Sequence, residues 1–424
     1  MINILLFLAC GDEVAEQKPS VSEKTQEDKK EQPAKTEALP SYEPIQDPLE
    51  GGPYPGLLVT QAWFRTGPSN KPIPGPARLE IWRDQGTSWS MTRVEDPDSN
   101  VFHKAIPFDD GILTIGAEKA LLKKWMFKEG KWAQETLWEQ SWGGKFDRLR
   151  DIEIGDVDGD GKDELVIATH DAGVVAVLHP DEKVSGSIRV EEFDQKADTF
   201  VHEIEIGDVD GDGLNEFFAT PTDRNKASAS QGGLMVMYKW NGSKFDRTVV
   251  DPFGKTHAKE ILATDLDGDG RSELFSVVEA EAIGKTIIQP VEIRQYTLNK
   301  DGSFTPTRIA TIEDRQTRFL VPGDFDNDGK VELIAAAMKS GLWMLDQQDS
   351  GVWQTVLIDG KSSGFEHTSY GADLNKDGKL ELYVAADEQG QLNQYVWSGS
   401  EFTKTTIGSI PERTITWNIV SGEF

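Results

Sequence analysis

The sequence lacks the features on which most enzymes and nucleic-acid-binding proteins depend. It holds a single cysteine, Cys10, in 424 residues, so no disulfide can form within the chain. Positive charge is scarce, because 44 lysines and arginines stand against 73 aspartates and glutamates. The resulting net charge of -29 argues against nucleic acid and anionic membrane surfaces as partners. No His-Glu-x-x-His motif, P-loop or dinucleotide fingerprint occurs, and the only cysteine belongs to the N-terminal apolar segment, which leaves nucleophilic catalysis little support.

Long apolar stripes with helical spacing are also absent, so we expect few helices. From Tyr54 onward, short β-rich runs alternate with glycine turns. Within this region an acidic stretch of nine residues recurs five times, always with glycine at its sixth position. The copies lie at 156–164, 208–216, 265–273, 324–332 and 373–381. A repeat near fifty residues indicates a propeller or a solenoid.

The spacing within each nine-residue loop suits a hard divalent cation. Residues 1, 3 and 5 turn their side chains to a common centre, and glycine at position 6 permits a sharp bend. Residue 7 can offer its backbone carbonyl, and residue 9 adds a carboxylate. Such an all-oxygen set favours Ca2+ over Mg2+, which prefers to keep several waters. One copy could be an ordinary acidic turn, but five copies favour up to five structural Ca2+ ions.

Each repeat has the same internal order, which predicts a four-stranded propeller blade. A short strand leads into the loop, as at 203–206, and a buried strand follows it, as at 165–168. A third strand runs into a glycine turn with an aromatic residue beyond it, and a fourth strand such as 247–250 closes the unit. We expect these aromatic side chains to pack between blades.

Two further units precede the five, so the predicted count is seven. One begins at His103, and its loop is shortened to 108–111. The other has strands at 57–64 and 77–82 but no first strand, and the C-terminal stretch 414–424 matches the missing one. We therefore predict an all-β fold, a seven-bladed β-propeller of four-stranded blades. The C-terminal strand should complete the first blade and remove the exposed sheet edges.

The N-terminal segment predicts a tethered protein. Residues 1–9 form a short apolar run that leads into Cys10, and the end of this run resembles a bacterial lipoprotein signal. The resemblance implies that Cys10 is lipidated and that the protein sits in the bacterial cell envelope, at the outer membrane or cell surface. Residues 10–50 indicate a disordered, acidic and Pro-containing linker before a propeller domain at 51–424. A frayed apolar N-terminus is the alternative.

The five loops resemble the FG-GAP/VCBS repeats of integrin α-subunit propellers and of bacterial surface proteins. The resemblance covers residues 54–424 and implies that each loop joins the first two strands of a blade and binds calcium. It implies a binding platform and does not by itself imply catalysis. Asn375 is neutral, so the last loop should bind its ion more weakly. Carried over with the residues at position seven, the metal set is Asp156, Asp158, Asp160, Lys162, Glu164; Asp208, Asp210, Asp212, Leu214, Glu216; Asp265, Asp267, Asp269, Arg271, Glu273; Asp324, Asp326, Asp328, Lys330, Glu332; Asp373, Asn375, Asp377, Lys379 and Glu381.

A column of basic and aromatic residues lies six positions before the first aspartate of each loop, or its equivalent. Its members are His103, Arg150, His202, Lys259, Arg318, His367 and, in the composite blade, Trp417. Because first strands line the channel, the column predicts a cationic ring at the mouth far from the loops, able to bind an anion. In the fifth blade, His257 competes with Lys259 for this position. Alternatively, these residues only pair with acids such as Asp151, Glu203 and Glu260.

Together these features favour a non-enzymatic, calcium-stabilised binding or adhesion module, tethered to the surface, for a glycan or protein ligand that can be anionic. We expect a monomer that contacts the membrane only through its lipid anchor. A polysaccharide lyase with His202 or His367 as the base is one alternative, because some lyases resemble this repeat pattern. An envelope-assembly scaffold is another. The sequence leaves enzymatic activity open.

Overall fold

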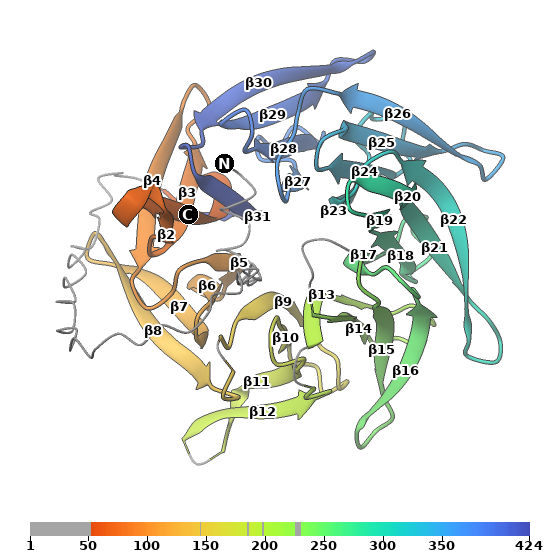
Figure 1. Cartoon of the computed structure of the whole chain (residues 1–424), viewed down its shortest axis with the longest axis horizontal. Coiled ribbons are helices and arrows are strands. Elements are labelled where there is room, and N and C mark those ends of the chain that lie inside the picture. The colour runs from red at the N-terminus through yellow and green to blue at the C-terminus, as the bar shows by residue number, and fades with distance from the viewer. Residues whose placement is uncertain (1–51, 145, 185, 197–198, 225–229) are drawn as a thin grey trace, which may run out of the picture.

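The computed structural model describes residues 52–424, except 145, 185, 197–198 and 225–229. Seven antiparallel sheets stand in a ring, and the innermost strands of neighbouring blades are in contact around its axis (Figure 1). We call the region along this axis, lined by the first strands, the channel. The predicted seven-bladed β-propeller is therefore confirmed. The predicted signal segment and linker lie outside the described residues. In the described part of the chain, no helix has the length and apolar character needed to cross a membrane.

The first blade joins the two ends of the domain, as predicted. Its strands, from the channel outward, are β31 (Thr414–Glu423), β1 (Pro55–Thr66), β3 (Ala77–Asp84) and β4 (Trp89–Asp96). The short β2 (Pro72–Pro74) follows the 3-10 helix η1 (Pro68–Asn70) and pairs with the far end of β1. The ring thus closes through hydrogen bonds between the C-terminal strand and the first strand of the domain.

The other six blades follow the predicted order, with the first strand at the channel and the fourth at the rim. Blades two to four consist of β5 (Phe102–Phe108), β6 (Gly111–Gly116), β7 (Ala120–Lys128) and β8 (Lys131–Gln140); β9 (Leu149–Gly155), β10 (Glu164–Thr169), β11 (Val175–Val184) and β12 (Ser187–Phe193); β13 (Thr199–Gly207), β14 (Glu216–Asp223), β15 (Leu234–Trp240) and β16 (Phe245–Pro252).

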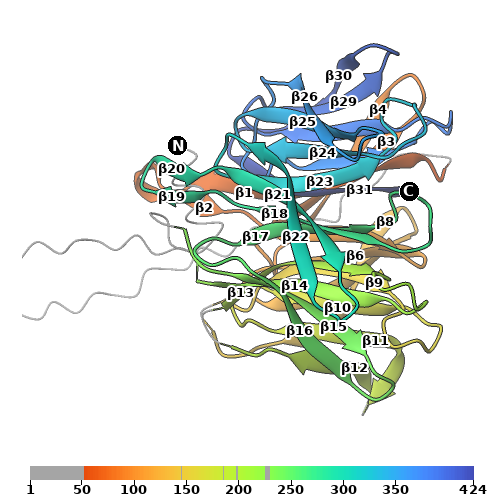
Figure 2. The same cartoon turned by 90° about the vertical axis from the view of Figure 1, so that its right-hand side faces the viewer.

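Blades five to seven consist of β17 (Ala258–Thr264), β18 (Glu273–Val278), β21 (Val291–Leu298) and β22 (Phe304–Ile312); β23 (Thr317–Gly323), β24 (Glu332–Ala337), β25 (Gly341–Gln347) and β26 (Trp353–Asp359); β27 (Ser369–Ala372), β28 (Glu381–Ala386), β29 (Gln391–Trp397) and β30 (Phe402–Ser409). The fifth blade also carries a hairpin of β19 (Glu281–Ile283) and β20 (Thr286–Gln289), which lies on the same side of the ring as β2 (Figure 2).

The burial of each strand follows its place in the blade. The second strands β10, β24 and β28 are buried along their whole length, whereas the fourth strand β30 is mostly exposed. Seven apolar clusters fill the seven interfaces between adjacent blades. Trp240 and Phe245, at a predicted glycine turn, lie 5.0 Å apart in the cluster between blades three and four. Each blade therefore depends on its neighbours for its core.

Candidate functional site

Each acidic loop connects the first and second strands of its blade, at what we call the loop end of the channel. In the third blade, Asp156 accepts hydrogen bonds from the N–H groups of Gly159 (2.7 Å) and Gly161 (2.9 Å), and Glu164 accepts one from Val157 (3.1 Å). Gly161 has a φ of 83°, in the left-handed region that favours glycine. The sixth-position glycines of the other four loops also have positive φ, so the predicted bend is present throughout.

Carboxylate oxygens converge inside these loops. In the sixth blade, Asp324, Asp326, Asp328 and Glu332 offer oxygens that all lie within 4.8 Å of one another. Glu332 is 1% exposed, and its Oε1 has no hydrogen-bond partner among the described residues. Burial raises the pKa of Glu332 to about 7, and the charge of Asp326 adds to the shift. A divalent cation fits this set, because it would pair the orphaned oxygen and offset the repulsion.

Similar groups of carboxylates form in three other loops. They consist of Asp156, Asp158 and Asp160; Asp208, Asp210 and Glu216; and Asp265, Asp267 and Asp269. In the seventh blade, Asn375 Nδ2 donates to Glu381 Oε1 at 2.7 Å, so this amide is turned toward the closing glutamate. Several of the predicted loops could therefore hold a metal ion.

The residues at position seven stabilise the loops through their N–H groups. Each donates to the side chain at position five at 2.9 to 3.0 Å, and the donors are Lys162, Leu214, Arg271, Lys330 and Lys379. The metal-binding role of their carbonyl oxygens stays a prediction.

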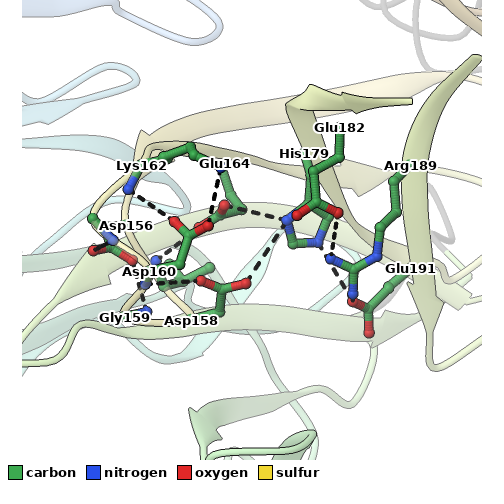
Figure 3. Close-up of polar contacts among 12 residues, drawn as sticks. Asp156, Asp158, Gly159, Asp160, Lys162, Glu164, His179, Glu182, Arg189 and Glu191 are labelled. Atoms are coloured by element: carbon green, nitrogen blue, oxygen red, sulfur yellow. Dashed lines mark hydrogen bonds and ion pairs between the residues drawn. The ribbon is translucent and has the colours of Figure 1, made fainter. Parts of the chain in front are cut away.

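The loops differ in the side chain that the third strand adds to them. The second residue of each second strand pairs with a residue of the third strand. The residues that directly follow these partners in the chain are, from the third blade to the seventh, His179, Lys239, Thr297, Asp346 and Val396. In the third blade, His179 Nδ1 lies 3.2 Å from Glu164 Oε1 and 3.9 Å from Asp158 Oδ2 (Figure 3). The sequence analysis missed this position, because it depends on the register between two strands.

The predicted column lies at the opposite end of the channel, and β-bulges place it there. In six blades the pairing of the first strand shifts register at the column residue, and these residues are His103, Arg150, His202, Lys259, Arg318 and Trp417. A β-bulge leaves a residue outside the pairing of the two strands and changes the direction of its side chain. The register shift occurs at the same position of the first strand in all six blades. The six side chains therefore lie at the same end of the channel, which we call the bulged end.

Three blades meet at Trp417. The guanidinium of Arg150, from the third blade, lies over the indole ring at 5.0 Å. The ring of His103, from the second blade, lies edge-on to it with 4.7 Å between centroids. Burial lowers the pKa of His103 well below its usual value, and the charge of Arg150 adds to the effect. His103 is therefore neutral at physiological pH.

A carboxylate from the seventh blade sits between two arginines. Glu366 lies in the connection between β26 and β27, and it is 1% exposed. Its Oε2 is 3.6 Å from Arg150 Nη2, and its Oε1 accepts a hydrogen bond from Arg318 Nη1. Arg318 also donates through Nε to Glu279 Oε1 at 3.2 Å. Glu366 of the seventh blade thus joins the arginines of blades three and six, and Glu279 of the fifth blade adds a second partner to Arg318.

Histidines of the third, fourth and fifth blades fill the rest of the bulged end. The ring of His202 lies 5.2 Å from that of His170 and 5.8 Å from that of His257. Burial, and then Lys259, lower the pKa of His202 well below its usual value. Burial works to raise the pKa of Glu279, but Lys259 and Arg318 outweigh it and hold that pKa below its usual value. In the fifth blade both His257 and Lys259 therefore belong to the cluster.

The structure does not bring His367 into this cluster. Its β27 begins only at Ser369, so no bulge aims it at the channel. Its Nδ1 contacts the carbonyl of Ala337 at 2.6 Å, and its Nε2 contacts Ser362 Oγ at 2.7 Å. Both ring nitrogens of His367 are therefore engaged in packing the seventh blade against the sixth.

The acids considered as partners of the column lie in a separate layer, deeper in the channel. Asp151 accepts from the N–H of Ile204 at 2.8 Å, and Glu260 accepts from that of Leu320 at 2.9 Å. Lys104 pairs with Asp151 at 3.0 Å and also contacts Glu153. Burial, followed by neighbouring carboxylates, raises the pKa of Glu203 well above its usual value. The predicted pairing of the column with these three acids does not occur as an ion pair among the described residues.

Glu279 is not among the predicted site residues, although its position in the repeat is regular. It stands fourteen residues after the first aspartate of its loop, as do His170, Thr222, Met338 and Asp387. Thr222 lies near the end of β14, and the other four directly follow their second strands. Second strands return the chain to the bulged end, so this offset marks a second column. Glu366 directly precedes the column residue His367, at a position where the other blades carry uncharged residues.

Part of the chain matches a known repeat family. Residues 265–335 match the sequence pattern of the FG-GAP-like repeat. The matched FG-GAP-like segment begins at the loop of the fifth blade and ends within β24, so it contains the loops of blades five and six. No curated protein matches the sequence.

Solved propellers share the architecture at low sequence identity. The periplasmic gluconolactonase of Pseudomonas aeruginosa is 13% identical with a TM-score of 0.51, covering 87% of this chain and 98% of that chain. A putative 6-phosphogluconolactonase of Bacteroides fragilis is 14% identical with a TM-score of 0.50 over the same shares. Cobalt-substituted apocarotenoid oxygenase of Synechocystis is 10% identical with a TM-score of 0.51, covering 90% and 98%. At these identities the likeness shows the fold alone.

Proposed function

We propose that this protein is a calcium-stabilised binding module that takes up a carboxylate-bearing ligand at the bulged end of its channel. The group of buried cations there carries the proposal. Arg150, Lys259 and Arg318 are buried cations that face the carboxylates of Glu279 and Glu366. The surrounding histidines are neutral because burial lowers their pKa values. A ligand carboxylate would add charge-assisted hydrogen bonds to these cations.

Two buried ring nitrogens support the same proposal. His202 Nε2 and Trp417 Nε1 have no hydrogen-bond partner among the described residues, and both side chains are less than 5% exposed. An unpaired buried polar group costs about 1–3 kcal/mol. A ligand carboxylate brings a negative charge, which would pair with the buried cations, and two acceptor oxygens, which could accept hydrogen bonds from the two ring nitrogens.

Burial of the histidines speaks against the lyase alternative. A general base must come within hydrogen-bond reach of the proton it removes. Both ring nitrogens of His367 are engaged, and burial lowers the pKa of His202 well below its usual value, which makes His202 a weak base. Binding without turnover is therefore the function that we propose.

Titration calorimetry with trigalacturonate, a glutamate-rich peptide and neutral maltotriose tests this function. We expect an acidic probe to bind and maltotriose not to bind. Arg150→Gln should weaken binding at least about tenfold, a loss of about 1.4 kcal/mol. Lys300→Gln, an exposed lysine between β21 and β22, should leave it unchanged. Melting temperatures show whether each variant is folded.

Results of two kinds, in affinity and in turnover, would contradict the binding function. One is equal affinity for maltotriose and the acidic probes, or equal affinity of folded Arg150→Gln and the unaltered protein. The other is sustained release of unsaturated uronate that stops in His202→Ala, which would support the lyase alternative.

Calcium in the loops is the second part of the proposal. At a calcium concentration ten times the dissociation constant, each site adds about 1.4 kcal/mol to the free energy of unfolding. We expect a chelator to lower the melting temperature and added calcium to restore it. Identical melting in calcium and in chelator would show that the loops are ordinary acidic turns.

We also propose that Cys10 is lipidated and anchors the protein in a bacterial envelope. The support is the short apolar run before Cys10 and the Pro- and Glu-containing stretch after it. Labelling with a palmitate analogue in a bacterial host should mark the unaltered protein and not Cys10→Ser. An unlabelled Cys10 protein would overturn the anchor.

A further inference from the structure

In the fourth blade a lysine occupies the centre of the acidic loop. Lys239 Nζ donates to Asp210, to Asp212 Oδ2 at 2.7 Å and to Glu216 Oε1 at 2.9 Å. These carboxylates stand at the third, fifth and ninth positions of the loop, where a calcium loop has its side-chain ligands. The ammonium group therefore contacts the oxygens that an ion would need.

The surroundings keep this lysine charged and in place. Burial disfavours the ammonium, but the hydrogen bonds that it donates to Asp210, Asp212 and Glu216 outweigh this effect and hold the pKa of Lys239 above its usual value. The side chain of Lys239 is 30% exposed and that of Glu216 is 1% exposed. An entering Ca2+ would have to displace the ammonium or lie beside it, where like charges repel.

The corresponding residues of the other four loops are neither lysine nor arginine. β21 places Thr297 there and β29 places Val396. In the sixth blade the residue is Asp346, whose charge contributes to the raised pKa of Asp326. The same position in the fold thus carries a cation in one blade and an additional carboxylate in another.

We propose that Lys239 takes the place of calcium in the fourth blade, so that this loop binds no ion and keeps its shape without one. The inference rests on the proposed binding of calcium by the other loops. It reduces the largest number of bound ions from the five predicted by the sequence to four.

An exchange of residues between blades four and five tests the inference. Bound calcium per protein is counted by equilibrium dialysis at a saturating calcium concentration. Lys239→Thr, which copies the fifth blade, should bind one ion more than the unaltered protein. Thr297→Lys, which copies the fourth blade, should bind one ion fewer. Lys244→Thr removes an exposed lysine that pairs with Asp246, and it should leave the count unchanged.

Asp210→Asn supplies the second readout. In the unaltered protein it should not change the count, because its loop holds no ion, whereas Asp326→Asn in the sixth blade should lower it by one. In chelator, Lys239→Thr should melt at a lower temperature than the unaltered protein, and calcium should restore it.

The outcomes separate this inference from the calcium proposal. If no calcium binds to any of these proteins, the calcium proposal itself is wrong. If calcium binds but Lys239→Thr adds no ion, or Asp210→Asn removes one, the role assigned to Lys239 is wrong. A count that rises by one in Lys239→Thr and stays unchanged in Lys244→Thr supports the inference.

Discussion

The two ends of the same first strands carry sites of opposite kinds. At the loop end the sites are acidic, partly exposed and repeated with nearly the same nine residues. At the bulged end the site is buried and cationic, and it is assembled from single residues of several blades. Each loop is complete within one short segment of chain, whereas the bulged end exists only once the ring has closed. The loop end should therefore respond to ions, and the bulged end to changes in ring closure.

Removing β31 should have the largest effect, because it opens the ring and dismantles the bulged end. Ile415, Trp417 and Ile419 are each less than 5% exposed. Burial of such side chains contributes about 1.5–3 kcal/mol each, in a total stability of about 5–15 kcal/mol. We expect a chain that ends at Arg413 to show no cooperative thermal unfolding by circular dichroism.

The control for ring closure is a chain that begins at residue 52, which should melt like the full protein. If the chain ending at Arg413 melts at the same temperature as the control, the closing role of β31 is wrong.

Neutralising Glu366 should have the next largest effect. Glu366→Gln leaves Arg150 and Arg318 without the carboxylate between them, and breaking a buried ion pair costs about 3–5 kcal/mol. Urea unfolding should show this loss equally in calcium and in chelator, because Glu366 is at the bulged end. Glu313→Gln, an exposed control, should change stability little. A loss that appears only in chelator would show that the two ends are coupled.

Asp326→Asn should have a smaller effect that depends on calcium. It removes one ligand of the sixth-blade loop, so up to about 1.4 kcal/mol of stabilisation by calcium should be lost. In chelator the variant should be as stable as the unaltered protein or slightly more so, because one repelling charge is gone. Asp349→Asn, an exposed neighbour that pairs with Lys330, is the control. A destabilisation of equal size in chelator would contradict the metal role of Asp326.

The smallest effect should come from protonation at the bulged end. Burial, and then Arg148, lower the pKa of His170 to about 3, against about 6.5 in the unfolded chain. Between these values the unfolded state binds the additional proton, so stability falls as the pH falls. From pH 7.5 to 5.5, the unaltered protein should lose about 1 kcal/mol relative to His170→Gln. A difference between the two proteins that is constant over this range would contradict the neutral state of His170.

The same contrast explains what the sequence could predict. The loops, the order of strands and the role of 414–424 follow from local patterns with a fixed period. The column can be predicted because the bulge lies at a constant number of residues before each loop. The same spacing includes His367, although its blade lacks the bulge.

The remaining features depend on contacts between distant segments. Glu366 reaches the bulged end from the connection between β26 and β27, and its contacts are with Arg150 and Arg318 of two other blades. Lys239 reaches its loop only through the register of β14 and β15. Neither contact has a local pattern by which the sequence alone could identify it.

Anomalous diffraction from one crystal, grown with calcium and soaked in bromide, tests the contrast between the two ends most directly. The account predicts calcium peaks in the loops of blades three, five, six and seven, and none beside Lys239. It also predicts a bromide peak near His202 and Lys259. Loops without calcium, together with bromide only on the outer surface, would contradict it.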